Sequence, residues 1–324
     1  MEIRERRTFM YYLGIDLGGT NIAAGIVDES YRLVAKTSRK THVPCSDGEI
    51  CEQLAQAATD TLKKAGLTLD DIPYIGIGSP GTVNRDSGII EYANNLHFQN
   101  LPLRKLMEDR LHKKTVLEND ANAAAYGEYK AGALRGAKNA VAITIGTGIG
   151  SGIIIDGKIL AGFNFAGGEM GHMVIREGGR MCTCERAGCW EAYASATGLI
   201  RTTREIMEKN RDSALWALTN GKLENVDGRT AFQAMRQGDA AGKAVVEEYV
   251  ADLACGLVNC INIFQPEILC IGGGVSNEGD PLMVPLKERV AKEIYSKYCS
   301  RQTVICRAQL GNDAGIVGAA LLGE

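Results

Sequence analysis

The chain has 324 residues, whereas a single hydrophobic core rarely grows beyond about 250–300 residues, so two domains around a cleft are expected. Hydrophobic residues make up 45% of the chain and charged residues 23%, a globular mixture that excludes a disordered or fibrous protein. The net charge of −3 argues against a nucleic-acid partner. No apolar run approaches the length of about 20 residues that spans a membrane, so no membrane association is expected.

The cysteines and the N-terminus together indicate a reducing compartment. The basic start at Arg4, Arg6 and Arg7 is followed by an apolar run that is too short for an export signal and is interrupted at Asp16. A cytoplasmic location is therefore expected. In a reduced chain, clustered cysteines indicate a metal site before a disulfide.

Apolar runs separated by glycine turns predict the strands and helices along the chain. Short apolar runs predict strands at 11–16, 22–27, 74–78, 115–117, 140–145, 152–155 and 268–271. Longer periodic patterns predict helices at 46–66, 102–111, 239–264 and 314–322, and an alanine-rich helix beginning at 118–120. The first of these helices starts with a capping box, Ser46 to Glu49, and should end at Gly66.

Two strand–turn–strand units, at 13–27 and 140–155, lie about 130 residues apart and resemble each other. They suggest two related α/β halves that face a shared cleft. Backbone N–H groups in a glycine turn can bind an anion, although a single such turn is more often purely structural. Three turns, two of them with a threonine, favour a phosphate site. They contain Gly18, Gly19 and Thr20; Gly146, Thr147 and Gly148; and Gly272, Gly273 and Gly274.

Asp120 stands at the expected start of the alanine-rich helix. A carboxylate at that place is most often a helix cap, because it accepts backbone N–H groups and suits the helix dipole. The functional alternative is a general base that accepts the proton of a hydroxyl nucleophile.

A compact group of metal-binding residue types occupies 169–191. Three thiolates and one imidazole form a closed tetrahedral zinc site, so His172, Cys182, Cys184 and Cys189 predict structural Zn²⁺. The alternative is a set of unliganded buried thiols beside an ordinary histidine. Glu169 and Glu191 flank the cluster and could accept hydrogen bonds from a polyhydroxylated ligand.

Four stretches resemble the ROK family of sugar kinases, within the actin-like, hexokinase-type ATPase superfamily. They are GIDLGGTN at 14–21, ENDANAA at 118–124, GEMGH at 168–172, and the cysteine-containing segment at 182–195. Within that family the chain looks most like the bacterial glucokinases. Two positions depart from the family pattern: Glu185 replaces a frequent glycine, and Phe98 replaces a frequent tryptophan, which affects the shape of the sugar site rather than the chemistry.

The resemblance implies a role for each matching residue. Asp120 is the catalytic base, and Asp16 helps to hold the Mg²⁺ that accompanies ATP. The three glycine turns bind ATP, the first two at its phosphates and the third beside adenosine. The implied sugar ligands are the backbone near Gly81 and the side chains of Asn95, Asn119, Glu169, His172 and Glu191.

The resemblance also implies an α/β chain with a two-domain actin-like (ribonuclease H-like) ATPase fold. The smaller domain would comprise 1–119 and the C-terminal helix at 305–324, and the larger domain 120–304 with the zinc loop. The implied reaction is ATP-dependent phosphorylation of glucose or a related hexose at the 6-hydroxyl. A homodimer or homotetramer is also implied.

Alternatives remain open at this point. The acceptor could be fructose, N-acetylmannosamine or allose, and the donor could be polyphosphate. A sugar-sensing regulator of the same family would need a DNA-binding helix-turn-helix before the first glycine turn, and about a dozen residues precede Leu13. The acidic charge also argues against that function.

Overall fold

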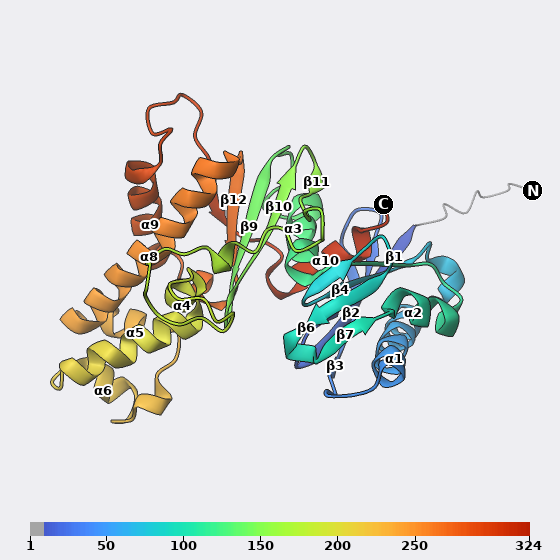
Figure 1. The fold of residues 1–324 in the computed structure, drawn as a ribbon, viewed down its shortest axis with the longest axis horizontal. Coiled ribbons are helices and arrows are strands. Elements are labelled where there is room, and N and C mark those ends of the chain that lie inside the picture. Colours follow the sequence, from blue (N-terminus) through green and yellow to red (C-terminus); the bar gives the residue numbers. More distant parts are fainter. Residues whose placement is uncertain (1–9) are drawn as a thin grey trace, which may run out of the picture.

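The computed structural model describes residues 10–324, so the basic start and the first residues of the expected smaller domain lie outside it. Two lobes lie side by side, and α3 and α10 lie where they meet (Figure 1). Each lobe is built on a five-stranded sheet. This is the α/β, actin-like ATPase architecture that the sequence predicted.

The small lobe contains the first sheet, in the order β3-β2-β1-β4-β8. Its strands are β1 (Tyr11–Leu17), β2 (Asn21–Asp28), β3 (Leu33–Lys40), β4 (Ile75–Ser79) and β8 (Thr115–Asn119). β1 pairs with β2 as the predicted antiparallel hairpin, while β4 and β8 continue the sheet in parallel. A second sheet beside it contains β5 (Thr82–Asn84), β6 (Ile89–Ala93) and β7 (Phe98–Leu101).

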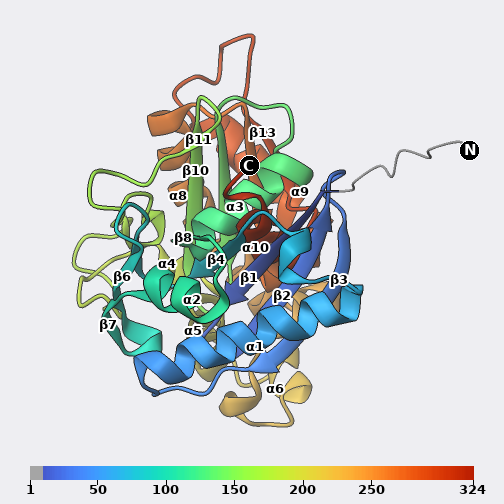
Figure 2. The same ribbon diagram turned by 90° about the vertical axis from the view of Figure 1, so that its right-hand side faces the viewer.

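Two helices cover the outer face of the first sheet, as Figure 2 shows: α1 (Asp47–Ala65) and α2 (Leu103–Leu111). Ser46 and Glu49 form the predicted capping box, and Gly66 ends α1 in the left-handed conformation. Pro102 lies just before α2 rather than in its first turn. The alternate residues of β1, Leu13, Ile15 and Leu17, are fully buried in the core beneath these helices.

The large lobe contains the second sheet, in the order β11-β10-β9-β12-β13. Its strands are β9 (Ala140–Ile145), β10 (Ile149–Ile155), β11 (Lys158–Ile159), β12 (Ile268–Gly272) and β13 (Val304–Arg307). The strand directions repeat those of the first sheet: β10 runs antiparallel to its neighbours β9 and β11, whereas β12 and β13 are parallel to β9. This repeated order agrees with the two related halves expected from the sequence.

The remaining helices of the large lobe surround the second core. They are α4 (Glu191–Ala194), α5 (Ala196–Lys209), α6 (Ala214–Leu218), α7 (Thr230–Arg236), α8 (Ala240–Phe264) and α9 (Asp280–Glu293). Trp190, Phe232 and Tyr249 are buried at the centre of this core. The indole N–H of Trp190 donates to the Asp252 carbonyl at 3.0 Å, so its one polar group is satisfied.

Helices α3 (Asp120–Ala131) and α10 (Ala314–Leu321) cross between the lobes. They approach closely because glycines stand at the crossing: a Cβ on Gly127 or Gly318 would collide with the backbone of the other helix. α10 packs on β1 and β4 of the small lobe, and α3 packs on β9 and β10 of the large lobe. The division of the chain at 119 and 305 stays a prediction, which this packing supports.

Several elements were not predicted from the sequence, notably β3, β13 and the helices between 191 and 236. β3 has an irregular, half-exposed pattern, and it lies at the edge of its sheet. In the described part of the chain, no helix combines the length and the hydropathy that crossing a membrane requires.

Candidate functional site

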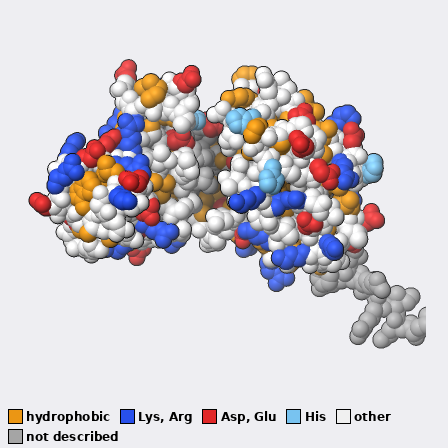
Figure 3. Space-filling view, turned by 90° about the horizontal axis from the view of Figure 1, so that it is seen from below, with side chains coloured by type: hydrophobic (Ala, Val, Ile, Leu, Met, Phe, Trp, Pro, Cys, Tyr) orange, Lys and Arg blue, Asp and Glu red, His pale blue; other side chains and the backbone are white. Residues whose placement is uncertain are grey.

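Asp16 and Asp120 lie close enough for their charges to interact. The molecule is hollowed between the two lobes (Figure 3). Asp16 lies near the end of β1, and Asp120 is the first residue of α3. The pKa of Asp16 is raised to about 6, mainly by burial and also by the nearby Asp120, while Lys36 opposes the rise. Asp120 keeps some surface open to the cleft, although protein surrounds it on nearly every side, and this enclosure raises its pKa as well.

Asn119, not Asp120, caps helix α3. The side-chain oxygen of Asn119 accepts the N–H groups of Ala121 at 2.9 Å and Asn122 at 3.1 Å. One carboxylate oxygen of Asp120 accepts the Ala121 N–H at 2.8 Å. Asn119 also donates to the carbonyl of Gly81 at 3.1 Å. The capping interpretation of Asp120 therefore gives way, because its neighbour Asn119 performs that task.

The first glycine turn joins β1 to β2. Gly18 donates to the Asn21 carbonyl at 3.0 Å, and the hydroxyl of Thr41 donates to the Gly18 carbonyl at 2.7 Å. At Gly19 an added Cβ would find only Asn95, at 3.7 Å. The fold leaves this backbone open, which is what close approach of a phosphate requires. The same contact places the predicted sugar ligand Asn95 beside the turn, with Thr20 exposed next to it.

The second and third glycine turns lie against each other. Gly146 donates to the Gly148 carbonyl at 2.9 Å in the β9–β10 turn, and the carbonyl of Thr147 accepts a hydrogen bond from Thr197 at 2.8 Å. Gly273 has φ +87°, and a Cβ there would collide with the backbone of Ile145, immediately before the second turn. Gly272 ends β12, and Gly274 opens the short helix after it. The predicted ATP residues of the large lobe thus form one continuous region.

The predicted sugar ligands of the large lobe converge near Asp120. Burial raises the pKa of Glu169, His172 opposes that rise, and the nearby carboxylates of Asp120 and Glu191 add to it. Glu191 accepts the N–H of Ile149 at 2.8 Å, which ties α4 to the end of the second glycine turn. Carboxylates gathered in this way are suited to accept hydrogen bonds from hydroxyl groups.

The four predicted metal ligands lie in one cluster. The ligand atoms of His172, Cys182, Cys184 and Cys189 all lie within 4.8 Å of one another. Nδ1 of His172 is 3.6 Å from the Cys182 sulfur, and the sulfurs of Cys184 and Cys189 are 3.6 Å apart. The pKa of Cys189 is raised to about 12, mainly by burial and also by the two neighbouring thiols. Three sulfur atoms and one imidazole nitrogen at these mutual distances offer four ligand atoms to a single cation.

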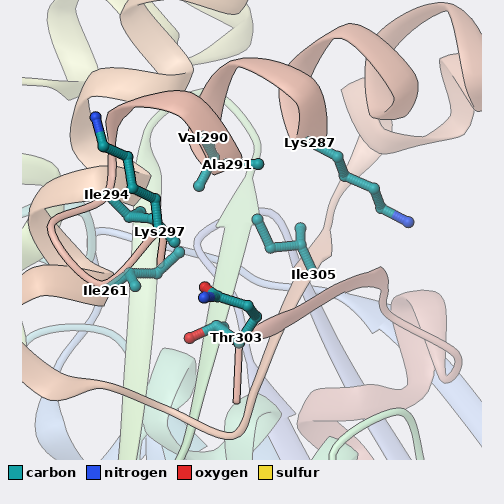
Figure 4. Close-up of a pocket in the computed structure, with 9 residues that line it drawn as sticks. Ile261, Lys287, Val290, Ala291, Ile294, Lys297, Thr303 and Ile305 are labelled. Atoms are coloured by element: carbon teal, nitrogen blue, oxygen red, sulfur yellow. The ribbon is translucent and has the colours of Figure 1, made fainter. Parts of the chain in front are cut away.

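A cavity of about 250 Å³ lies elsewhere in the large lobe, between the end of α8, α9 and β13 (Figure 4). Ile261, Val290, Ile294 and Ile305 line it with apolar surface, and the ammonium ends of Lys287 and Lys297 point away from it. None of the predicted site residues lines this cavity. It is a separate feature and not the site described above.

Sequence reasoning missed three residues that shape the site. A Cβ on Gly315 would lie 2.6 Å from the carboxylate of Asp16, so the first turn of α10 lies directly beside that side chain. Lys36 forms an ion pair with Asp313, just before α10. Ser151 accepts the N–H of Met170 at 3.1 Å and donates to the Gly168 carbonyl, which holds the Glu169 segment to β10. Each contact joins distant parts of the chain, so no local pattern indicated it.

The similarity to known proteins extends over nearly the whole chain. The family model described as ROK family matches residues 12–324. The chain is 38% identical over 309 residues to a glucokinase of Thermotoga maritima, covering 95% of each chain. It is 35% identical over 310 residues to a glucokinase of Streptomyces coelicolor, covering 95% of this chain and 96% of the other. It also resembles a crystal structure of a ROK family glucokinase from Streptomyces griseus in complex with glucose and AMPPNP, with a TM-score of 0.81, 34% identity, and coverage of 96% and 98%.

Proposed function

The chain belongs to the ROK family, and we propose that it phosphorylates glucose at the 6-hydroxyl with ATP as the donor. The observation that carries this proposal is the placement of Asp120. Its carboxylate is enclosed, its pKa is raised, and it lies between Asp16 on one lobe and Glu169 on the other. A base between a phosphate side and a hydroxyl-binding side suits phosphoryl transfer to an alcohol.

Residues on the two sides of the cleft have different roles in this reaction. Asp120 orients the 6-hydroxyl and accepts its proton during in-line attack on the γ-phosphoryl group. The turns at Gly18 and Gly146 bind the phosphates through backbone N–H groups, and Gly273 lies on the adenosine side. Asp16 would hold Mg²⁺, which neutralises the phosphate charge when bound. Catalysis of this kind consists mainly of positioning and electrostatic stabilisation.

Sugar recognition falls to both lobes. Asn95, Asn119 and the backbone near Gly81 approach from the small lobe, whereas Glu169, His172 and Glu191 approach from the large lobe. Closure of the lobes around the sugar would exclude water and restrain hydrolysis of ATP. The glucokinase relatives, at 35–38% identity, support glucose as the acceptor over fructose, N-acetylmannosamine or allose.

Structural Zn²⁺ fits the cysteine–histidine cluster. In a tetrahedral site with Zn–S bonds of about 2.3 Å the sulfur atoms lie about 3.8 Å apart, close to the 3.6 Å between Cys184 and Cys189. His172 turns Nδ1 toward Cys182, so Nε2 is left for a sugar hydroxyl. All four ligand positions are supplied by the protein, so the metal would shape the loop rather than activate water.

The proposal also covers the cellular location and the oligomeric state of the enzyme. All ten cysteines are free, and a zinc site needs reduced thiols, which supports a cytoplasmic location. The family resemblance supports a homodimer or homotetramer, which light scattering on the purified protein tests. A mass equal to one chain at micromolar concentration would contradict it.

A coupled assay over a hexose panel, with ATP and polyphosphate as separate donors, tests the function. We expect the largest kcat/KM with glucose and ATP. A tenfold preference for another hexose, or for polyphosphate, would contradict the proposed substrates while leaving the kinase chemistry in place. Sugar binding without phosphorylation of any hexose would favour the regulator alternative.

A further inference from the structure

A closed loop of the large lobe reaches the small lobe next to the sugar ligands. The Gly167 N–H donates to the Ala161 carbonyl at 2.8 Å, so the two ends of the loop 161–167 are joined and its tip projects. The loop leads directly into Gly168, which Ser151 holds, and then into Glu169. The position of the tip therefore bears on the position of Glu169.

The two phenylalanines of this loop differ in their exposure. Phe163 is 97% exposed. Phe165 is half-buried, and the guanidinium carbon of Arg85 lies 6.0 Å from the centre of its ring, within cation–π range. Phe165 also has φ +61°, a left-handed conformation that bulky side chains rarely adopt. Such a conformation persists only where its surroundings hold it, and strained residues of this kind gather at ligand sites.

Arg85 is itself held firmly on the small lobe, in the turn between β5 and β6. Arg104 donates to the carbonyl of Arg85 and, at 3.1 Å, to that of Asp86. The guanidinium of Arg85 pairs with Glu118 at 2.9 Å, and Glu118 is only 3% exposed. Glu118 in turn accepts the N–H of Asn119 at 2.9 Å. Arg85 is thus tied to the residue that caps the catalytic helix.

We propose that the ring of Phe165 on Arg85 joins the two walls of the sugar site and that both are positioning residues for the sugar. The contact holds the Glu169 loop against the β5–β6 hairpin, which begins next to Gly81, and so fixes this part of the site before the sugar arrives. Without it, binding must also order the loop, which lowers affinity. The ATP turns lie elsewhere and are spared. This inference rests on the proposed function, because it takes Glu169 and Asn119 as sugar ligands.

Calorimetric titration of glucose into four proteins tests the contact: the wild type, Phe165→Ala, Arg85→Lys and the double variant. Phe165→Ala should raise the glucose Kd about two- to fivefold, the value of an exposed cation–π contact, with an unchanged Kd for an ATP analogue. Arg85→Lys keeps a cation for Glu118 but loses the planar face, so it should raise the glucose Kd similarly. The double variant should show no further rise, because both changes remove the same contact.

Phe163→Ala is the matched control, since it removes the same side chain from the same loop where it is almost fully exposed. It should bind glucose like the wild type, and Phe165→Trp should retain wild-type affinity. Phe165→Gly separates the ring from the backbone, because glycine adopts this φ without strain. Glucose affinity equal to the wild type in Phe165→Ala or in Phe165→Gly would overturn the inference, as would additive effects in the double variant. Phe165→Leu replaces Phe165→Ala if melting curves show that the latter is unfolded.

Sugar binding by the wild type separates this inference from the proposed function. If the wild type binds another hexose instead of glucose, the proposed substrate is wrong, and the same comparison with that hexose still decides the contact. If the wild type binds no sugar, both are overturned.

Discussion

The hairpins β1–β2 and β9–β10 hold the same place in their sheets, but they carry different side chains. Asp16 pairs with Ala23 one residue before the end of β1, and Thr144 pairs with Gly150 at the corresponding point of β9. Both hairpins offer a glycine turn, yet only the small lobe adds a carboxylate. The glycine turn is thus repeated, whereas the carboxylate that we propose for the metal ion is not.

The helices that follow the two sheets show a similar difference. Asp120 begins α3, and Asp313 immediately precedes α10. Asp313 is paired with Lys36, whereas no ion pair within the described residues involves Asp120. Burial without a cation raises the pKa of Asp120, as expected for a group that takes up a proton. On this repeated scaffold, the absence of a counter-ion among the described residues separates the proposed base Asp120 from the paired Asp313.

The strongest test of that comparison replaces Asp120 and, separately, Asp313 by asparagine. Asp120→Asn should lower kcat about 10²–10⁴-fold, because the proton acceptor is lost. Its pKa is raised in the folded state, so the ionised form costs stability at neutral pH, and the variant should melt at or above the wild-type temperature. A coupled assay and a melting curve measure both effects.

Asp313→Asn is the control for that experiment. It should keep kcat within tenfold of the wild type, because this acid serves an ion pair rather than proton transfer. A value of kcat within tenfold of the wild type for Asp120→Asn, with a normal melting curve, would remove Asp120 as the base.

The second test compares the hairpins. Asp16→Asn should lower kcat/KM for ATP by about 10²-fold, since a cation that neutralises phosphate charge is worth several kcal/mol. Thr144→Val, at the corresponding position, keeps the shape and should change kcat/KM less than threefold. Equal losses in the two variants would show that the hairpins contribute alike, and that Asp16 has no special link to Mg²⁺.

The third test separates the sugar side from the nucleotide side. Removing zinc with a chelator, or changing Cys184→Ala, should raise the glucose KM about 10–100-fold, because the loop that orients His172 loses its shape. The ATP KM should stay within twofold, since the glycine turns lie outside the loop. Freshly purified protein without about one zinc per chain by elemental analysis contradicts the metal site, and an unchanged glucose KM in metal-free protein contradicts its link to the sugar.

Local patterns predicted the first hairpin, the capping box of α1, the helix that begins at Asp120, and the cluster of zinc-binding residue types. Each of these depends on residues that are close in sequence, so spacing alone carries the information. By contrast, the first turn of α10 lies beside Asp16 only after the chain has folded, and nothing near Gly315 signals it. The contact between Phe165 and Arg85 is similar, because the positive φ of Phe165 follows from packing and not from its own preference.

The fourth test uses the glycines of the two phosphate turns. A Cβ at Gly146 would meet nothing within 4 Å, and a Cβ at Gly19 would meet only Asn95 at 3.7 Å. Alanine at either position should therefore fold normally and raise the Kd for ATP about tenfold by obstructing hydrogen bonds to a charged ligand. Gly273→Ala, which collides with Ile145, should instead lower the melting temperature. Unchanged ATP affinity in both turn variants would make the turns structural only.

The smallest expected effect is a pH dependence of activity that Asp16 causes. Because burial and Asp120 raise the pKa of Asp16 to about 6, Asp16 is protonated below that pH and cannot hold a cation. Protonation of Asp16 should therefore halve kcat/KM for ATP near pH 6 and lower it about tenfold for one further unit of acidity, and protonation of Asp120, whose pKa is also raised, adds a loss that Mg²⁺ does not shift. Protons and Mg²⁺ compete for the same carboxylate, so raising the Mg²⁺ concentration should move the acid limb to lower pH. Thr144→Val should keep this behaviour and Asp16→Asn should lose it, whereas a wild-type profile that stays flat to pH 5 at low Mg²⁺ would contradict the link between Asp16 and the cation.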